Sequence, residues 1–521
     1  MPALRRSAED SDTRVVRNTV ANGAGAVAGV LITLVMTPLL IDRLGTEAYG
    51  IWILATTLTF GFGYLSFADL GFEQAAARYV AIARADGDIE QMNRVLSTGF
   101  FILAAIGLVL TPIFMALAVP LVDLFNVPED MRHEATWAFA LVMAQLAFEL
   151  PGRGFASALE GAQRFGVLQI VRLVQGILIA VAMAVTVLTG NGIAVLGAAT
   201  LGATIAVFVL GWVAMRLAVP DARITPRLFS RTVVRELWHF GSRLFGFRLL
   251  SSVYRQLDKT IIGVALAASF VTTYEVANKL YGSAALVQSL ATSSLVPAVA
   301  YSRANAEKLR AILLRGSNYT LAIALPVTLA GIIFASPLIR TWIGESQVQA
   351  ALPAQLLLLS LAPGFLIAVG QTMLVALGRM NELLILAALW TAINVGLSIW
   401  FVQMWEINGV IVATLIATVA LVPPNIWLFL DELDVSLWLW NRAVVLPVIP
   451  GLVVQGAVGY GLLQLADDSG SLVVVALLGS VSIAVAYAVY WFVGLDGPHR
   501  AALTQTIRRT VGLEHDVTAP R

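Results

Sequence analysis

The chain of 521 residues contains no cysteine and few charged residues. The absence of cysteine excludes disulfides, thiolate metal sites and cysteine nucleophiles, and four scattered histidines do not form a zinc cluster. Only 12% of the residues are charged, well below the share that a water-facing surface needs. The 33 basic and 32 acidic residues nearly cancel, so a net charge of +1 leaves no surface of one sign for a nucleic acid.

Hydrophobic residues dominate instead, at 59% of the chain with a mean hydropathy of +0.84. About 14 apolar stretches have the length of roughly 20 residues that crosses the hydrocarbon core of a bilayer. The sequence therefore predicts an all-α polytopic membrane protein with about 14 transmembrane helices. The second predicted span is Tyr49–Ala68, the fourth is Thr136–Leu159, and the seventh, Leu237–Val264, is the most highly charged.

The basic residues of the loops predict the orientation, because positively charged loops stay in the cytoplasm. They fall almost entirely on one side, and the other side has only Arg43, Arg132 and Arg340. This asymmetry predicts that both termini are cytoplasmic. All loops are short, so no outer domain is expected for sugar-transfer chemistry, and no phosphate-binding glycine loop is present. We therefore expect no enzyme, no cofactor and no metal.

A weak internal repeat, with an offset of about 215 to 225 residues, pairs residues 83–86 with residues 302–305. An even number of spans in each repeat gives both halves one orientation, related by an axis along the membrane normal. Chance similarity between apolar segments is the alternative. The repeat predicts two six-helix lobes related by a pseudo-two-fold axis, plus two C-terminal helices. The expected parts are a cytoplasmic tail (1–17), an N-lobe (18–217), a cytoplasmic loop (218–236), a C-lobe (237–430), the last two spans (443–494) and a cytoplasmic tail (495–521).

Several short motifs, spread from the first loop to the twelfth span, are similar to those of a known family. They are Arg43-Leu44-Gly45 with Tyr49-Gly50, Asp69-Leu70-Gly71-Phe72 with Arg78-Tyr79, Leu257-Asp258-Lys259 with Ile261-Ile262-Gly263, Tyr274 with Ala277 and Lys279-Leu280, and Asn408-Gly409-Val410 with Ala413-Thr414. Their order and spacing resemble the polysaccharide-transporter (Wzx-type) branch of the multidrug, oligosaccharidyl-lipid and polysaccharide (MOP) flippase superfamily. The resemblance implies alternating access around a central cavity, which carries a lipid-linked sugar from the inner to the outer leaflet.

The seventh predicted span carries several charges, although an ionised side chain at the bilayer centre costs roughly 2.5–3.5 kcal/mol. At about 100° per residue, Arg248, Arg255 and Lys259 share one helix face. Arg255 and Lys259 are like charges at i and i+4 and need a nearby anion. Asp258 can neutralise one of them. The basic face is predicted to line an aqueous cavity and bind a diphosphate. The alternative is that Arg243 and Lys259 snorkel from the ends of the span, and that the other basic residues pair with acids on neighbouring helices.

The candidate substrate-binding residues are Arg248, Arg255, Lys259, Arg243, Arg172 and Lys279, although Arg172 and Lys279 lie near span ends, where snorkelling is an equal alternative. Glu149 is placed to pair with Arg153, or else to bind a coupling ion. Asp69 and Glu73 suit a gate or helix packing as well as substrate contact. The candidate coupling or gating residues are Glu149, Asp258, Asp69 and Glu73.

The function expected from the sequence and the resemblance is that of a flippase for undecaprenyl-diphosphate-linked oligosaccharide in a bacterial inner membrane. It would serve the biosynthesis of O-antigen, capsule or exopolysaccharide, with a polysaccharide polymerase and chain-length proteins as candidate partners. Two alternatives remain: a cation-coupled multidrug or small-molecule exporter of the same superfamily, and a non-transporting scaffold for envelope assembly. The coupling ion, the sugars and the oligomeric state are not determined by the sequence.

Overall fold

The computed structural model describes residues 29–59, 63–293 and 305–495, together with residues 299, 302, 497, 500 and 504. Within these ranges, the side chains of residues 66, 67, 243, 244, 246–255 and 293 are not described. All regular structure in the described part of the chain is helical, as predicted. Eight of the described helices are long and apolar enough to cross a membrane, so the chain is a multi-pass membrane protein. The number of 14 spans stays a prediction.

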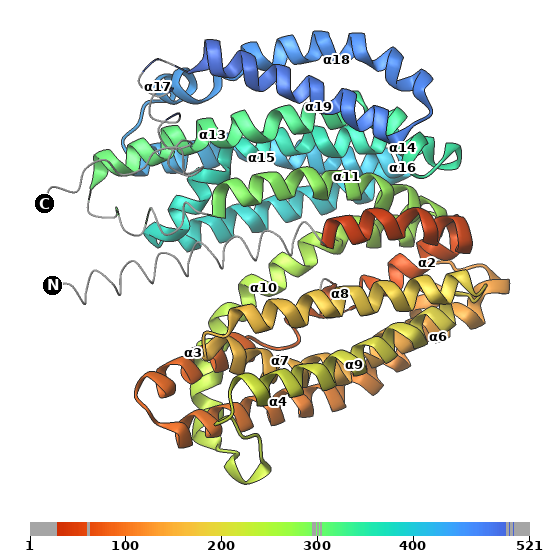
Figure 1. Ribbon diagram of the computed structural model, residues 1–521, viewed down its shortest axis with the longest axis vertical. Coiled ribbons are helices and arrows are strands. Elements are labelled where there is room, and N and C mark those ends of the chain that lie inside the picture. The colour runs from red at the N-terminus through yellow and green to blue at the C-terminus, as the bar shows by residue number, and fades with distance from the viewer. Residues whose placement is uncertain are drawn as a thin grey trace, which may run out of the picture. The chain divides into compact units, whose positions relative to one another are not determined.

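The chain divides into two compact units (Figure 1). Unit 1 comprises Met1–Lys279 with Val395–Ala413, and unit 2 comprises Leu280–Asn394 with Thr414–Arg521. This division by contacts places the seventh predicted span and the first part of the eighth with the N-terminal helices. The predicted N-lobe and C-lobe were defined by a symmetry between two repeats, whereas the two units are defined by contacts. The lobes therefore stay a prediction.

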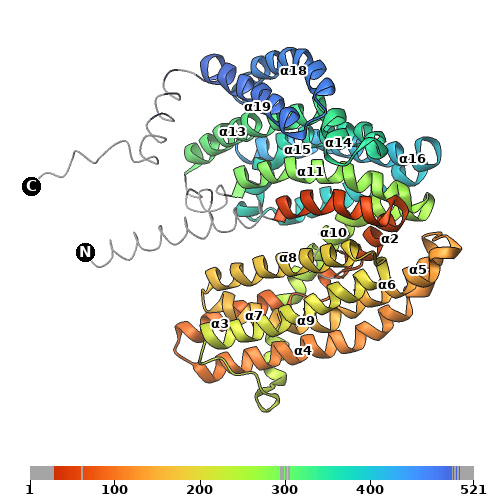
Figure 2. The same cartoon turned by 45° about the vertical axis from the view of Figure 1, so that its right-hand side comes forward.

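The described part of unit 1 begins with a helical stretch at residues 29–44, followed by a series of helices that pack side by side (Figure 2). Its other elements are α2 (Thr46–Thr56), η1 (Tyr64–Phe67), α3 (Phe72–Ala85), α4 (Ile89–Ala116), α5 (Ala118–Leu124), η2 (Glu129–Met131), α6 (Arg132–Ala144), α7 (Leu146–Gly161), α8 (Phe165–Leu188), α9 (Ile193–Ala218), η3 (Pro226–Leu228), α10 (Arg231–Ala265), the first part of α11 (Ala268–Ser293) and the middle part, Val395–Ala413, of α16 (Met380–Glu432). Its hydrophobic core lies among α3, α4, α7 and α9 and includes Leu103, Leu150 and Phe155. Burial of the apolar faces of these helices in the core stabilises their packing.

The second predicted span is not one continuous helix, which corrects the expectation for Tyr49–Ala68. Helix α2 ends at Thr56, and the short 3₁₀ helix η1 begins at Tyr64. The Tyr64 backbone N–H donates to the Thr57 carbonyl over 2.7 Å. A Cβ at Gly63 would collide with that carbonyl, so this turn requires a glycine. Hydropathy alone could not reveal the break, because the turn residues are as apolar as the helix.

The fourth predicted span is also divided, into α6 and α7 on either side of Gln145. The Gln145 amide donates to Thr200 Oγ1 on α9 over 3.0 Å and accepts from Thr204 Oγ1 over 3.3 Å. Pro151 lies inside α7 and removes one backbone N–H from the helix. The Gln145 side chain therefore joins two helices inside unit 1.

The eleventh and twelfth predicted spans, Leu383–Gln403 and Gly409–Leu430, form the single long element α16 (Met380–Glu432). Its backbone leaves helical geometry at Trp405 and Glu406, where Glu406 has a φ of 50°. The two helical parts on either side agree with two separate spans. A Cβ at Gly409 would overlap the Phe401 carbonyl, so the bend after Glu406 depends on glycine.

Unit 2 contains the rest of α11 and of α16, and the C-terminal helices. Its other elements are α13 (Ala306–Ile333), α14 (Ala335–Trp342), η4 (Glu345–Ala350), α15 (Ala351–Leu377), α17 (Leu437–Trp440), η5 (Asn441–Val445), α18 (Ile449–Ser469), α19 (Leu472–Val489) and η6 (Tyr490–Gly494). Its core lies mainly among α13, α15 and the end of α16, where Phe365 and Phe429 are fully buried.

The last two helices are attached to α13 by polar side chains as well as by packing. Asn318 Nδ2 donates to the Val444 carbonyl over 3.0 Å, and Asn318 Oδ1 accepts the Tyr490 hydroxyl. Gln455 Nε2 donates to the Pro326 carbonyl over 2.7 Å. In lipid, where no water competes, such bonds fix helices against one another.

Candidate functional site

Helix α10 carries most of the predicted basic site. The backbone of Arg243, Arg248 and Arg255 belongs to this continuous helix, but their side chains lie outside the described ones. Their shared face and their contact with a diphosphate therefore remain predictions. Beyond Arg255 the side chains are described, and they place Asp258 and Lys259 opposite helix α11.

Two lysines and one glutamate from α10 and α11 form a single ion-paired group, here called the Lys–Glu–Lys cluster. Lys259 Nζ lies 2.7 Å from Glu275 Oε2, and Lys279 Nζ lies 2.5 Å from Glu275 Oε1. Each oxygen of the carboxylate therefore has its own lysine. The Glu275 side chain is only 3% exposed, whereas Lys259 is 13% and Lys279 is 24% exposed. The glutamate is thus the inner member, and the lysines form the more accessible side.

The helical geometry explains this arrangement. Glu275 precedes Lys279 by four residues on α11, the spacing and order in which a glutamate and a lysine meet on one helix face. Lys259 reaches the same carboxylate from α10. A buried carboxylate without a cation would cost several kcal/mol, so this glutamate requires at least one of the lysines. The cluster carries two positive charges and one negative charge.

Asp258 Oδ2 accepts the Tyr274 hydroxyl over 3.0 Å, while the carboxylate at Lys259 belongs to Glu275. Two residues further along α10, the hydroxyls of Thr260 and Tyr64 share a hydrogen bond of 2.7 Å. The predicted neutralisation of Arg255 by Asp258 stays a prediction, because the Arg255 side chain lies outside the described ones. The acid that neutralises Lys259 therefore comes from the neighbouring helix.

Sequence reasoning missed Glu275, although a signal was available. A glutamate and a lysine at i and i+4 in one predicted span, beside a span with an excess of basic residues, indicate a shared ion pair. What the sequence could not supply was which face of α11 turns toward Lys259. That orientation depends on the packing of α10 and α11.

A second charged group joins α3 and α7. Arg153 Nη1 lies 2.9 Å from Glu73 Oε2, and the Ser157 hydroxyl donates to the Glu73 carbonyl over 3.0 Å. Asp69 is fully buried, and its Oδ1 accepts the Gly71 backbone N–H over 3.3 Å. This bridge fits the helix-packing role predicted for Glu73, while the gating and substrate-contact roles stay predictions.

The Arg153 guanidinium reaches Glu73 on α3, and its predicted pairing with Glu149 on its own helix stays a prediction. Glu149 is half-buried on α7, and its predicted role in coupling stays a prediction. Arg172 lies 3.1 Å from Glu160, with 48% of its side chain exposed. Its predicted contact with substrate stays a prediction as well.

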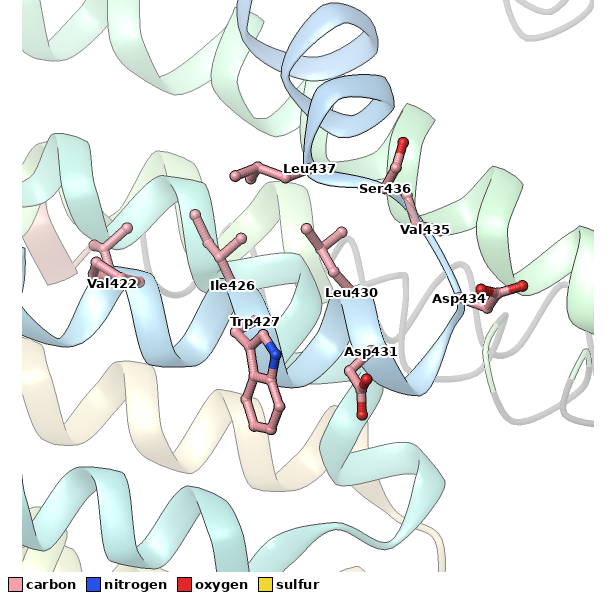
Figure 3. A pocket seen from close by; sticks show the side chains of 10 residues that line it. Val422, Ile426, Trp427, Leu430, Asp431, Asp434, Val435, Ser436 and Leu437 are labelled. Carbon is pink, nitrogen blue, oxygen red and sulfur yellow. The ribbon is translucent and has the colours of Figure 1, made fainter.

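A hollow of about 590 Å³ lies elsewhere, at the end of α16 and the start of α17 (Figure 3). Val422, Ile426 and Leu430 extend toward Leu437, whereas Trp427 extends from the other side of α16 (Figure 3). None of the predicted site residues lines it. Among the described residues, no group of three or more acids and histidines could hold a metal ion.

Comparison with known proteins gives the chain's family. A model of the polysaccharide biosynthesis protein family matches residues 43–351. A putative O-antigen transporter from Shigella flexneri is 23% identical over 334 residues, which cover 64% of this chain and 77% of the relative.

Two solved structures share the fold. The lipid II flippase MurJ in an inward closed conformation aligns with a TM-score of 0.69 at 15% identity, over 91% of this chain and 99% of that chain. An inward-facing multidrug resistance transporter of the MATE family aligns with a TM-score of 0.65 at 16% identity, over 78% of this chain and 94% of that chain. The proteins found are transporters and flippases, in agreement with the expectation that the chain is not an enzyme.

The comparisons confirm the resemblance that the short motifs indicated. The family model covers more than half of the chain, and its match includes α10, α11 and the Lys–Glu–Lys cluster. The chain is therefore a multi-pass membrane protein of the polysaccharide biosynthesis protein family, with the fold of the MOP flippase superfamily.

Proposed function

We propose that this protein moves an undecaprenyl-diphosphate-linked oligosaccharide from the cytoplasmic to the outer leaflet of a bacterial inner membrane. The family and the likeness to a putative O-antigen transporter support a cargo used in polysaccharide synthesis. The fold shared with a lipid II flippase supports a mechanism that moves a lipid-linked cargo by alternating access. The polysaccharide would be an O-antigen, a capsule or an exopolysaccharide.

The observation that carries this proposal is the excess of positive charge in the Lys–Glu–Lys cluster. Two lysines share one carboxylate on helices within the matched family region. A diphosphate is an anion, and ammonium groups bind phosphate oxygens as point charges. The cluster can therefore attract such a headgroup while its own glutamate stays paired.

The rest of the chain fits the same proposal. The basic loops favour cytoplasmic termini, on the side where lipid-linked sugars would be loaded. The partners are the lipid-linked oligosaccharide and the bilayer, with a polymerase and chain-length proteins acting on the delivered product. Arg248 and Arg255 would extend the basic surface along α10.

A cation-coupled drug exporter is the second candidate, because a MATE transporter shares the fold. An exporter of cationic drugs needs acidic residues toward its cargo, since a positive site repels such molecules. The described cluster has the opposite balance, with its single glutamate behind two lysines. A polysaccharide precursor therefore fits this chain better.

Deleting the gene is the decisive experiment. We expect the deletion strain to accumulate a lipid-linked oligosaccharide, identified by its mass, and to lose the corresponding surface or secreted polysaccharide. The wild-type chain should reverse both effects, and the Lys279→Met variant should reverse neither at equal membrane abundance. A deletion strain with normal polysaccharide and no lipid-linked intermediate would overturn the proposal. Loss of drug resistance without that intermediate would favour the exporter.

A further inference from the structure

Attraction of an anionic cargo would require only the two lysines of the Lys–Glu–Lys cluster, yet the cluster also contains a glutamate. Glu275 forms ion pairs with both lysines in the structure, with one lysine at each carboxylate oxygen. A cargo anion that binds a lysine must therefore compete with this carboxylate. The glutamate occupies the place that a phosphate oxygen would take.

The two lysines differ in how readily they can leave Glu275. Lys279 is the more exposed, at 24%, and belongs to the same helix as the glutamate. Lys259 is 13% exposed and contacts Oε2, the oxygen that also lies 3.5 Å from Asn278 Nδ2. If Lys279 turns away, Glu275 keeps Lys259 and Asn278, so the buried carboxylate is still neutralised. If Lys259 is absent, Lys279 must stay.

The choice of lysine at these positions is consistent with a partner exchange. The chain has only three lysines among 33 basic residues, and two of them belong to this cluster. Lysine carries a compact charge on a flexible stem, whereas arginine makes fixed bidentate pairs. A residue that changes partners is better served by the flexible stem.

We propose that Glu275 is an internal substitute for the cargo's anionic group, and that Lys279 exchanges it for a cargo phosphate while Lys259 keeps the glutamate paired. Lys279 is then the cargo ligand, and Lys259 and Glu275 are positioning residues. As the cargo phosphate leaves, Glu275 forms its ion pair with Lys279 again, and this re-pairing favours release of the cargo. This inference rests on the proposed function, because it assumes an anionic cargo.

The test is binding of farnesyl diphosphate to the purified full-length chain in detergent, by calorimetry at one pH and salt concentration. Lys279→Met should weaken binding about tenfold or more, because a charge-assisted contact is lost. Lys259→Met should weaken it by a similar factor, because Lys279 can no longer leave Glu275. Glu275→Gln should tighten binding about tenfold and slow release of the ligand.

The double variant Lys259→Met with Glu275→Gln distinguishes exchange from direct contact. It removes the carboxylate that holds Lys279 and leaves Lys259 nothing to position, so the double variant should bind as tightly as Glu275→Gln alone, about tenfold tighter than the wild type. Lys308→Met, at an exposed position on α13, is the matched control and should change nothing. Farnesol lacks the diphosphate, so its calorimetric titration measures binding through the isoprenoid tail alone. Monodisperse elution of each variant shows that it is folded.

Two results would overturn the inference: a double variant that binds about tenfold more weakly than Glu275→Gln alone, or Glu275→Gln binding no tighter than wild type. The first would make Lys259 a direct ligand, and the second would make the cluster a structural pair. If Glu275→Gln does not fold, the comparison of the double variant with the wild type decides alone, and a double variant that binds no tighter than the wild type overturns the inference. Failure here leaves the proposed function intact, since that function is judged by the lipid-linked intermediate in the deletion strain.

Discussion

At the scale of single residues, charge inside the membrane is what distinguishes this chain. Each ionised group needs a partner there, and the described bridges Glu73–Arg153 and Glu275–Lys259 both join different helices. The sequence shows the charges but does not show these partners. A charged residue can therefore bridge two helices, as Glu73 does with Arg153, or exchange its partner for an anion, as proposed for Lys279.

The basic face of α10 gives the first prediction. Changing Arg248 and Arg255 to Ala together should abolish transport while leaving the protein in the membrane, because the loss falls on the anionic cargo. Lysine at both positions should restore part of the activity, since it keeps the charge but loses bidentate geometry. Polysaccharide output in the complemented deletion strain is the measurement. Normal output from the double alanine variant would remove these arginines from the site.

The bridge between α3 and α7 gives the second prediction. Glu73→Gln should lower stability by about 1–3 kcal/mol, because Arg153 loses its charged partner at 2.9 Å. Arg153→Met should cost a similar amount, and the double variant should cost less than the sum of the two. Thermal unfolding in detergent measures all three. Strict additivity would show that the two side chains do not stabilise each other.

At the scale of elements, close approach between helices sets strict limits on side-chain size. Helix α2 meets α11 at Gly50, where an added Cβ would overlap the backbone carbonyl of Ala268. The Thr272 hydroxyl donates to the Thr46 carbonyl over 2.5 Å at the same junction. This junction lies directly before Tyr274 and Glu275, so it helps to fix where α11 presents its glutamate.

The third prediction concerns Gly50. Gly50→Ala should destabilise the protein by about 1–3 kcal/mol, because the new methyl group has no space beside Ala268. Gly282→Ala on α11 is the control, since nothing lies within 4 Å of its added Cβ. That control should be neutral or up to about 1 kcal/mol stabilising, as alanine favours helix. Equal effects at the two positions, measured by thermal unfolding, would contradict the close contact.

The fourth prediction concerns the attachment of the last helices. Asn318→Leu should lower stability by about 1–2 kcal/mol, because it removes the bonds to the Val444 carbonyl and the Tyr490 hydroxyl. Limited proteolysis between α17 and α18 should also become faster. Gln403→Leu, at an exposed position in α16, serves as the control. Unchanged stability and cleavage for Asn318→Leu would show that apolar packing alone holds these helices.

At the scale of the whole molecule, the sign of the cargo determines the energetics of transport. About two negative charges leaving a negative interior gain on the order of 4–5 kcal/mol per 100 mV of membrane potential. The potential alone can then drive export, if the protein's own charges stay in place. Coupling through Glu149 would add a dependence on a proton or sodium gradient.

The fifth prediction separates these two sources of energy. In proteoliposomes with a potassium diffusion potential and no pH or sodium gradient, the rate of flipping should follow the imposed potential. Flipping that ignores the potential contradicts the electrophoretic mechanism. Glu149→Gln should leave the rate unchanged if the potential suffices. A strong loss of rate in this variant would assign Glu149 to coupling.

The class of the molecule follows from residue types and their spacing alone. Composition and the length of the apolar stretches predict a polytopic helical membrane protein, because lipid tolerates few charges and requires long apolar helices. The dispersed motifs gave the family, which the comparison with known proteins confirmed. These properties depend on residue types and on spacing along the chain, and both are visible without a fold.

Which charges meet, by contrast, depends on how the helices pack in three dimensions. The break after Thr56, the Arg153–Glu73 bridge and the carboxylate of Glu275 between two lysines depend on how helices rotate and pack. Hydropathy does not encode that rotation, because lipid-facing and buried positions are equally apolar in a membrane. The sequence therefore predicted a basic site on α10, and the packing of α11 against it supplied the acid.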